Sequence, residues 1–376
     1  METEKVSLKD MLFNAMKITK IAGDIHRVYP DFKRKEFIQD VLSKLPELEL
    51  KQRINHISFC FQAHLLSHFP EAVRILLQSL PERNNPSLSD DDFGDFIYAA
   101  HADFVAEFGC TRAYLEHSLN ALEEITMRFS AEYAIRNFFN AFPQETMKIV
   151  EKWSKHQHYH VRRLASEGTR PKLPWGMKIA VSVESPLVLL DELYKDRTRF
   201  VTRSVANHLN DISKTHPELV LARLKQWKNE KKQNDKELDF IIRHAMRTLI
   251  KKGNKEALAF LGICDKPKIK IENIKISESV QMNMYLEKTL DILAIEDCTL
   301  LIDYVLTFQN SKGKMNRIKV FKWKQITLKK NEKLTLPKKH EMKQFMSTRT
   351  LYPGTHQWAL QLNGDVVHRH YFELKE

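Results

Sequence analysis

The sequence contains little of what marks secreted or membrane-spanning proteins. Its 376 residues include only four cysteines, Cys60, Cys110, Cys264 and Cys298, which lie far apart and form no CxxC pair. We therefore expect reduced thiols, as in a cytoplasmic protein. The charged amino-terminal segment lacks the apolar stretch of a signal peptide, and no run of 18 apolar residues is present to cross a membrane. These absences predict a cytoplasmic protein with no membrane partner.

Glycine is also scarce, with ten in the whole chain, and up to about residue 263 the pattern is helical. Apolar residues recur there at three- and four-residue spacing, as in residues 59–69 and 134–142. Proline lies mostly between these segments, where it is suited to the first turn of the next helix. Four such junctions are visible, at residues 68–73, 141–147, 215–220 and 252–258.

The helical part also repeats itself. Residues 161–166 (VRRLAS) resemble residues 202–207 (TRSVAN), an offset of 41 residues that is typical of HEAT-like repeats. The pattern predicts a mostly α protein whose residues 1–264 form a HEAT-like solenoid. An ordinary helical bundle with similar turns is the alternative.

After residue 264 the pattern changes to short strands separated by turns. The segments KIKIENIKI, TLLIDYVLTF, RIKVFKWKQITL, HQWALQL and HRHYFEL are β-rich, and turn signals lie at residues 310–314, 352–356 and 363–365. These features predict a small all-β immunoglobulin-like sandwich over residues 265–376. The domain has no Cys–Trp–Cys pattern, so its strand order stays open.

Positive charge is concentrated in this second part. The chain carries a net charge of +12, and residues 266–376 contribute +8 of it, from 20 Lys and Arg against 12 Asp and Glu. Within residues 311–339, Lys319, Lys322 and Lys324 alternate with Phe321 and Trp323. Basic and aromatic residues interleaved in this way favour contact with nucleic acid, although lysines also protect exposed edge strands.

The helical part also contains several basic residues that lie four or eight residues from an acidic one, so that both fall on the same face of a helix. Arg163 and Glu167 are four residues apart, as are Glu132 and Arg136, whereas Asp211 follows Arg203 by eight. Such spacings place an acid and a base on one helical face, and simple ion pairing between them is the alternative to a functional role.

Residues 160–176, HVRRLASEGTRPKLPWG, resemble the signature of the AlkC/AlkD-type DNA glycosylases, which are HEAT-like repeat enzymes. Residues 204–220 resemble the next repeat of that family and residues 129–139 the preceding one. The strand-rich tail resembles the immunoglobulin-like domain of the AlkC branch. By this resemblance, Glu132, Glu167 and Asp211 are the candidate catalytic acids, and Trp175 is the candidate lesion contact.

The resemblance implies a monofunctional glycosylase that hydrolyses the N-glycosidic bond of cationic alkylated bases, such as 3-methyladenine, in double-stranded DNA. Carboxylates suit this chemistry because bond cleavage leaves positive charge on the sugar. We expect no cofactor and no metal, a monomer, and association with the nucleoid when DNA is bound. The candidate DNA contacts are Arg162, Arg163, Arg170, Lys172, Arg199, Arg203, Lys319, Lys322 and Lys324.

Two other interpretations stay open from the sequence. His156, His158 and His160 form a possible metal site, but they precede a helix, and no Cys or acidic cluster is nearby in the sequence. A non-enzymatic HEAT-repeat scaffold that binds nucleic acid or protein is the second. A scaffold does not need Glu167, Asp211 and Trp175 together. Substituting these residues should leave binding by a scaffold intact, whereas it should abolish base release by an enzyme.

Overall fold

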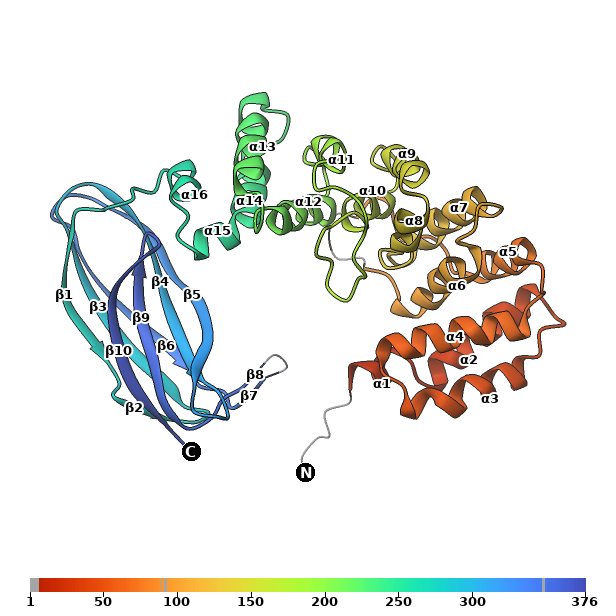
Figure 1. Ribbon diagram of the computed structural model, residues 1–376, viewed down its shortest axis with the longest axis horizontal. Coiled ribbons are helices and arrows are strands. Elements are labelled where there is room, and N and C mark those ends of the chain that lie inside the picture. Colours follow the sequence, from red (N-terminus) through yellow and green to blue (C-terminus); the bar gives the residue numbers. More distant parts are fainter. Residues whose placement is uncertain (1–6, 89, 91–92, 347–348) are drawn as a thin grey trace. The chain divides into compact units, whose positions relative to one another are not determined.

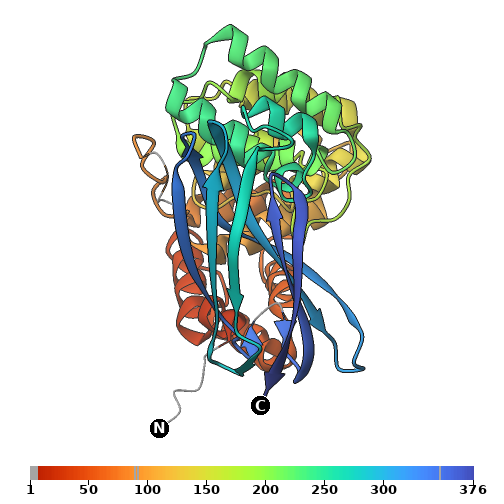
Figure 2. The ribbon, with the colours of Figure 1, turned by 90° about the vertical axis from the view of Figure 1, so that its left-hand side faces the viewer.

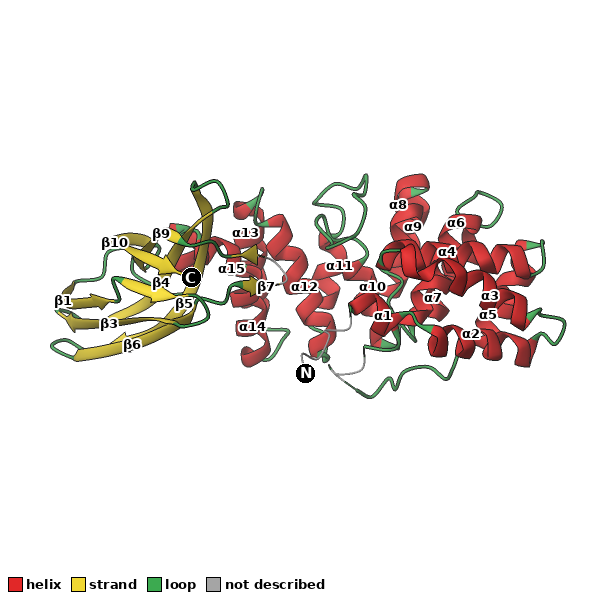
Figure 3. Ribbon diagram, turned by 90° about the horizontal axis from the view of Figure 1, so that it is seen from below, coloured by secondary structure: helices red, strands yellow, loops and turns green. Residues whose placement is uncertain are grey.

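Helices occupy the first part of the chain and strands the last, in the computed structural model of the protein (Figure 1). The structure describes residues 7–88, 90, 93–346 and 349–376. The helices are α1 (Leu8–Leu12), α2 (Ala15–Val28), α3 (Arg34–Lys44), η1 (Leu45–Glu47), α4 (Leu50–His64), α5 (Phe69–Ser79), η2 (Phe96–Tyr98), α6 (Ala99–Gly109), α7 (Leu115–Thr126), α8 (Ile135–Ala141), α9 (Pro143–Trp153), α10 (Tyr159–Glu167), α11 (Leu187–Leu193), α12 (Arg199–Ile212), α13 (Pro217–Glu230), α14 (Asp235–Ala245), α15 (Arg247–Lys251) and α16 (Lys255–Phe260). The predicted class, mostly α with a carboxy-terminal β-sandwich, is confirmed, and Figure 3 shows the two kinds of secondary structure in separate parts of the molecule.

The predicted helix junctions are real. Proline lies in the first turn of α5, α9 and α13, where its missing N–H leaves no intrahelical hydrogen bond unmade. At the fourth junction the Asn254 side chain accepts a hydrogen bond from the Ala257 N–H at 2.9 Å and caps α16. In each case the residue that ends one helix is followed closely by a residue suited to begin the next.

Within the helical unit, helices two positions apart in the chain pack together. α4 packs against α6, α10 against α12, and α12 against α14. The two similar segments, residues 161–166 and 202–207, lie at corresponding positions in the neighbouring helices α10 and α12. Val161, Leu164 and Ala165 of α10 and Val205 and Ala206 of α12 are buried, and the two helices pack together. None of the helices in the described ranges is long and apolar enough to cross a membrane.

The strands form two sheets and a small hairpin. They are β1 (Ile269–Ile276), β2 (Ser279–Gln281), β3 (Tyr285–Ala294), β4 (Cys298–Gln309), β5 (Met315–Leu328), β6 (Lys333–Glu341), β7 (Phe345–Met346), β8 (Arg349–Thr350), β9 (Gly354–Leu362) and β10 (Asp365–Lys375). One sheet has the order β1-β3-β6 and the other β2-β10-β9-β4-β5, while β7 pairs with β8. The described pairs are antiparallel except that β2 runs parallel to β10.

The core of the sandwich comes from alternate residues of the facing strands. Leu286 and Leu290 of β3 and Leu300 and Ile302 of β4 are fully buried, as is Trp358 of β9. Burying each large aliphatic side chain contributes about 1.5–3 kcal/mol. β5 and β6 end their respective sheets and follow each other in the chain, so both are edge strands. Figure 2 shows the long strands running side by side.

The last two helices pack against the sandwich. Leu258 and Ile263 form a small buried cluster with Leu301, on the outer side of β4. The turn at Gly364, where φ is +88°, approaches Gly253 so closely that a side chain on either glycine would meet the backbone of the other. The compact unit that contains the strands therefore comprises Met246–Glu376 together with Pro217–Ala222, and the helical unit comprises Met1–His216 and Arg223–Ala245. The sequence predicts the boundary later, between residues 264 and 265.

Candidate active site

The three acids singled out in the sequence come from neighbouring helical repeats. Glu167 is the last residue of α10, and Asp211 is the penultimate residue of α12. Glu132 lies in the turn that precedes α8. Glu167 and Asp211 are only 4% and 2% exposed, and the Glu132 side chain is 15% exposed. Ionisable groups so poorly solvated need partners of opposite charge.

Two arginines supply these partners and link the acids into a chain of alternating charge. Arg163 Nη1 donates to Glu132 Oε2 at 2.9 Å, and its Nη2 lies 3.8 Å from Glu167 Oε1. Arg170 Nη1 donates to Glu167 Oε1 at 2.5 Å, and its Nε donates to Asp211 Oδ2 at 2.9 Å. Each guanidinium therefore bridges carboxylates of two successive repeats.

The ion pairs that matter here run between repeats rather than along one helix. Glu132 does not pair with Arg136, four residues on, but with Arg163, 31 residues away. Asp211 pairs with Arg170, 41 residues away, and also accepts from Lys214 Nζ at 2.8 Å. Of the spacings considered in the sequence, only that of Arg163 and Glu167 gives an ion pair within one helix.

The carboxylate of Glu167 is held in its ionised form. Burial alone raises its pKa, but the charges of Arg163 and Arg170 and hydrogen bonds from Ser204 and Arg170 lower the pKa below its ordinary value. Ser204 Oγ donates to Glu167 Oε2 at 2.5 Å. Because Glu167 also ends a helix, it adds its charge to the negative end of the helix dipole. The site is thus a network of carboxylates that are each paired with a cation and have little access to water.

A loop between α10 and α11 carries both Arg170 and Trp175, and the Arg136 side chain anchors this loop. Arg136 is fully buried, and it donates to the backbone carbonyls of Gly168 at 3.0 Å, Arg170 at 2.9 Å and Met177 at 2.6 Å. Burial, followed by the charge of Arg170, lowers its pKa to about 10, so the guanidinium is still charged at neutral pH. Arg136 therefore fixes where the loop, and with it Arg170, lies.

Trp175 is presented to solvent by an unusual backbone. Its φ is +63°, a left-handed conformation that is costly for a residue with a bulky side chain, and its side chain is 58% exposed. Its carbonyl accepts a hydrogen bond from Lys51 Nζ at 2.9 Å. A strained, exposed tryptophan on the same loop as Arg170, which binds two of the acids, is well placed to contact a ligand.

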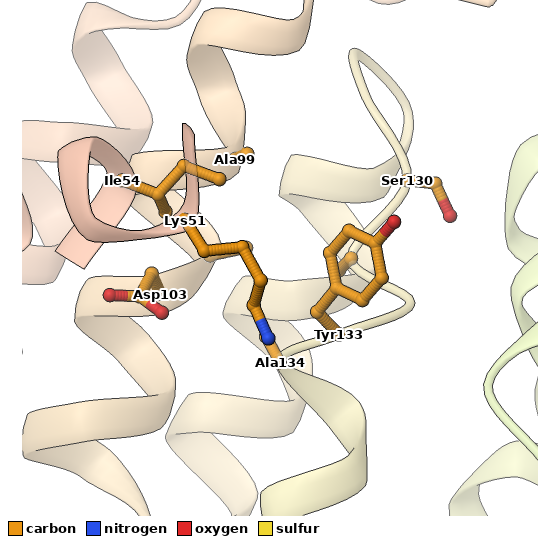
Figure 4. A pocket seen from close by; sticks show the side chains of 9 residues that line it. Lys51, Ile54, Ala99, Asp103, Ser130, Tyr133 and Ala134 are labelled. Atoms are coloured by element: carbon orange, nitrogen blue, oxygen red, sulfur yellow. The ribbon is translucent and has the colours of Figure 1, made fainter. Parts of the chain in front are cut away.

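A small pocket of about 40 Å³ lies next to Glu132. Lys51, Asp103, Ser130 and Tyr133 line it, together with small apolar residues, and Figure 4 shows the Lys51 side chain extending toward Tyr133. Lys51 Nζ lies 6.0 Å from the centre of the Tyr133 ring. The pocket adjoins the acid chain because Ser130 Oγ donates to Glu132 Oε2 at 2.9 Å.

All five arginines predicted to contact DNA form internal ion pairs. Arg162 donates twice to Asp196, Arg199 pairs with Glu237, and Arg203 pairs with Asp90. Arg163 and Arg170 belong to the acid chain described above. Lys172 is exposed and forms no ion pair with the residues that the structure describes. The contact of these five arginines and of Lys172 with DNA stays a prediction.

The lysines of the second unit are arranged differently. Lys319, Lys322 and Lys324 are exposed along the edge strand β5, and none forms an ion pair within the described part of the chain. Phe321 and Trp323 alternate with them and are half-buried against the sandwich core. The predicted DNA contact and the protection of a sheet edge remain compatible with this arrangement.

The three histidines at the start of α10 have structural contacts, and the prediction that all of them precede the helix is wrong for His160, which is its second residue. His158 caps the helix, since its Nδ1 accepts from the His160 N–H at 3.2 Å, while its Nε2 donates to the Asn84 carbonyl at 2.9 Å. His156 Nδ1 accepts from the His158 N–H at 3.0 Å. The described ranges contain no group of three His, Cys, Asp or Glu side chains arranged to hold a metal ion.

Sequence reasoning missed several residues of the site. Ser130 and Ser204 hold two of the acids, Arg136 anchors the loop, and Phe200 lies 4.5 Å beneath the Arg163 guanidinium. Phe93, which is 53% exposed, contacts Phe200 edge-on at 5.3 Å. Serine and phenylalanine are common in ordinary helices, so no sequence signal distinguishes them here.

Comparison with known proteins gives related chains of similar length. A family model described as DNA alkylation repair enzyme matches residues 103–249, which include the three acids, and another, described as the C-terminal Ig-like domain of YhaZ, matches residues 264–376. The uncharacterized protein YhaZ of Bacillus subtilis (strain 168) is 32% identical over 366 residues, which are 94% of this chain and 96% of YhaZ. The structure of the alkylpurine DNA glycosylase AlkC of Pseudomonas fluorescens, bound to DNA containing an abasic site analog, superposes with a TM-score of 0.89 at 32% identity and covers 98% of this chain and 100% of that chain.

Proposed function

The chain belongs to the DNA alkylation repair enzyme family, in the AlkC branch with a carboxy-terminal immunoglobulin-like domain, and on that basis we propose that it is a DNA glycosylase. Its proposed reaction is hydrolysis of the N-glycosidic bond of cationic N-alkylated bases, such as 3-methyladenine, in double-stranded DNA. The observation that carries the proposal is the chain of linked carboxylates on successive repeats, of which Glu167 and Asp211 are buried and Glu132 is partly exposed.

Buried, ionised carboxylates fit this reaction physically. Alkylation of a ring nitrogen makes the base cationic, and breaking the glycosidic bond transfers positive charge to the sugar. A carboxylate that is already ionised and held in a poorly solvated site stabilises this charge without reorganising. Because the pKa of Glu167 is lowered, Glu167 acts as a fixed charge or a base rather than as a proton donor.

The three acids take different parts in the proposed mechanism. Glu167 and Asp211 face the developing charge, and one of them orients or deprotonates the attacking water. Glu132 belongs to the same network through Arg163. Trp175 contacts the lesion, where an indole adds about 1–2 kcal/mol of cation–π attraction to a positively charged base.

The proposed reaction is water-driven and monofunctional. Lys214 Nζ donates to Asp211 Oδ1 at 2.8 Å, so this amine is engaged in an ion pair with one of the acids. In this proposal Lys214 keeps that partner and does not attack the sugar, so no covalent intermediate forms through it. The proposed products are a free base and an abasic site in an intact strand.

The remaining residues serve DNA binding in this proposal. The repeats of residues 1–264 form a HEAT-like solenoid that carries the acids, and residues 265–376 add DNA contacts. On binding DNA, three arginines leave their carboxylate partners and bind phosphates: Arg162, Arg199 and Arg203. Lys172, which is exposed, binds a phosphate in place of water. Because its proposed substrate is chromosomal DNA, we expect the protein to act at the nucleoid. We also propose that it acts as a monomer.

The test separates base release from DNA binding. Glu167→Gln keeps the size of the side chain and removes its charge, and Glu116→Gln on α7 is the matched control because Glu116 is exposed. We expect Glu167→Gln to lose at least tenfold in single-turnover base release while DNA affinity changes much less, and Glu116→Gln to be unaffected. Equal loss of binding and release would instead fit a non-enzymatic scaffold, and strand cleavage by the wild type would refute the monofunctional mechanism.

A further inference from the structure

The inner face of the sandwich contains basic side chains that have no acidic partner among the residues that the structure describes. Lys288 of β3 points into the core on the same face as Leu286 and Leu290, and it is only 3% exposed. Its direct neighbour across the strands is Lys338 of β6. Like charges placed directly opposite each other in a sheet repel, so this pair is unfavourable by itself.

Two more basic groups join these lysines. His340, also on β6, lies with its Nδ1 2.8 Å from the Tyr304 hydroxyl. Arg349 of β8 is 9% exposed, and its guanidinium lies 4.4 Å from the centre of the Phe308 ring and 5.9 Å from that of Phe321. None of the four basic side chains forms a salt bridge with a carboxylate among the residues with described positions.

The cluster is held together by aromatic rings. Lys288 Nζ lies 4.2 Å from the centre of the Tyr304 ring. Tyr304 stacks on Phe321 at 5.3 Å, and the His340 ring meets Phe321 edge-on at 4.6 Å. Lys288, His340 and Arg349 therefore converge on the Tyr304 and Phe321 rings, and Lys338 lies across from Lys288 on the edge strand β6.

Several hydrogen-bond donors in this cluster are unused. Lys288 Nζ, His340 Nε2, and Arg349 Nε and Nη1 are buried and have no hydrogen-bond partner in the part of the chain that is described. Burial lowers the pKa of His340 to about 4, so its ring is neutral. In the tautomer in which Nδ1 accepts from the Tyr304 hydroxyl, Nε2 carries the ring hydrogen and is a donor, as are the unused nitrogens of Arg349 and of the charged Lys288.

Unused buried donors are costly, and a group that accepts several hydrogen bonds at once would satisfy them together. The two lysines would also lose their mutual repulsion if a negative charge lay between them. The same arrangement explains why burial, and then the charge of Lys338, lowers the pKa of Lys288 to about 7 in the absence of an anion. An oxyanion with several acceptor oxygens meets all of these requirements.

We propose that Lys288, Lys338, His340 and Arg349 form an oxyanion-binding site of the immunoglobulin-like domain, which takes a phosphate group between the edge strands β5 and β6. The phosphate is either inorganic or a phosphodiester of the DNA backbone. Exposed Lys322 and Lys324 follow the adjacent strand β5, which favours a phosphate that belongs to a polyanion. Binding of a DNA phosphate rests on the proposed function, whereas binding of inorganic phosphate does not.

The first arm of the test uses inorganic phosphate and the full chain. We expect phosphate, at constant ionic strength against chloride, to raise the melting temperature of the wild type and of Lys288→Arg. Lys288→Met removes the unpaired buried charge, so its melting temperature in the absence of phosphate should be several degrees above that of the wild type. It also removes part of the site, so phosphate should no longer raise its melting temperature. Lys275→Met, at an exposed lysine of β1 in the same sheet, is the matched control and responds as the wild type does.

The outcomes that overturn the proposal are distinct. A Lys288→Met protein that responds to phosphate as strongly as the wild type does would show that the anion binds elsewhere. Where Lys288→Met fails to fold, Arg349→Gln replaces it with the same readout, and an undiminished phosphate response again refutes the site.

The second arm separates the two sources of phosphate. If the site holds a backbone phosphate, Lys288→Met reduces the slope of log K for DNA binding against log salt concentration by about 0.9 relative to Lys275→Met. An unchanged slope together with a lost phosphate response assigns the site to inorganic phosphate. Because neither arm measures base release, an inactive glycosylase would leave both results interpretable.

Discussion

Replacing Asp211 by Asn removes one negative charge from the acid cluster, and an amide NH2 takes the place of the oxygen that accepts from Lys214 Nζ. Asp211 is 2% exposed, and the amide oxygen of Asn still accepts the hydrogen bond from Arg170 Nε that the carboxylate accepts at 2.9 Å. A carboxylate about 5 Å from a developing unit charge, at an effective dielectric constant of about 20, contributes about 3 kcal/mol. This free energy corresponds to a factor of about 100–200 in rate.

The assay for Asp211→Asn is single-turnover release of base from methylated duplex DNA at saturating protein, with DNA affinity measured in parallel. Asp239→Asn is the matched control, because Asp239 is an exposed acid of α14 that pairs with Arg243 four residues on. We expect a loss of about two orders of magnitude in the rate for Asp211→Asn, little change in affinity, and a wild-type rate for the control. A wild-type rate for Asp211→Asn would refute the idea that this charge stabilises the transition state.

Three further predictions address pH, loop position and charge, and a fourth addresses metals. The pKa of Glu167 is lowered and its ionised form is the active one. The rate of single-turnover base release should therefore stay constant as the pH falls to the ordinary pKa of glutamate, and should decline only below that pH. A decline in rate that begins near pH 6 would contradict this role of Glu167. Arg136→Met leaves three backbone carbonyls without their hydrogen-bond donor. The free energy of unfolding, measured by thermal unfolding, should fall by about 2–4 kcal/mol, and base release should slow more than tenfold. An unchanged free energy of unfolding would exclude the anchoring role. Replacing Lys319, Lys322 and Lys324 together by Gln should flatten the salt dependence of DNA binding by about two to three units of slope, and an unchanged slope would leave edge protection as their function. Dialysis against EDTA should leave base release unchanged, while a loss that zinc restores would support a histidine metal site.

The sequence predicts the helices well because their physical signals are local. Periodic apolar residues mark the buried face of each helix, and prolines such as Pro143 and Pro217 mark first turns. The strands were harder to recognise where charge interrupts the alternation. β3 and β6 were not singled out, since β3 places Lys288 in the core and β6 contains Pro337 among lysines.

The site was predictable only in part, because its partners are distant in the sequence. The resemblance to a family picked out Glu132, Glu167 and Asp211, but helical spacing gave the wrong partner for Glu132. The arginine bridges span 31 and 41 residues, and only the packing of successive helices brings them together. The domain boundary shows the same limit, since α15 and α16 look like any other helices until Leu258 is seen against β4.

The central claim is that this protein releases alkylated bases from DNA. The measurement that tests it most directly is chromatographic quantification of free 3-methyladenine after the purified full chain is incubated with methylated duplex DNA. We predict release well above the spontaneous rate, with the DNA strands left intact and the release lost in a Glu167→Gln, Asp211→Asn double variant. Release by the wild type at the rate of a protein-free control would contradict the account.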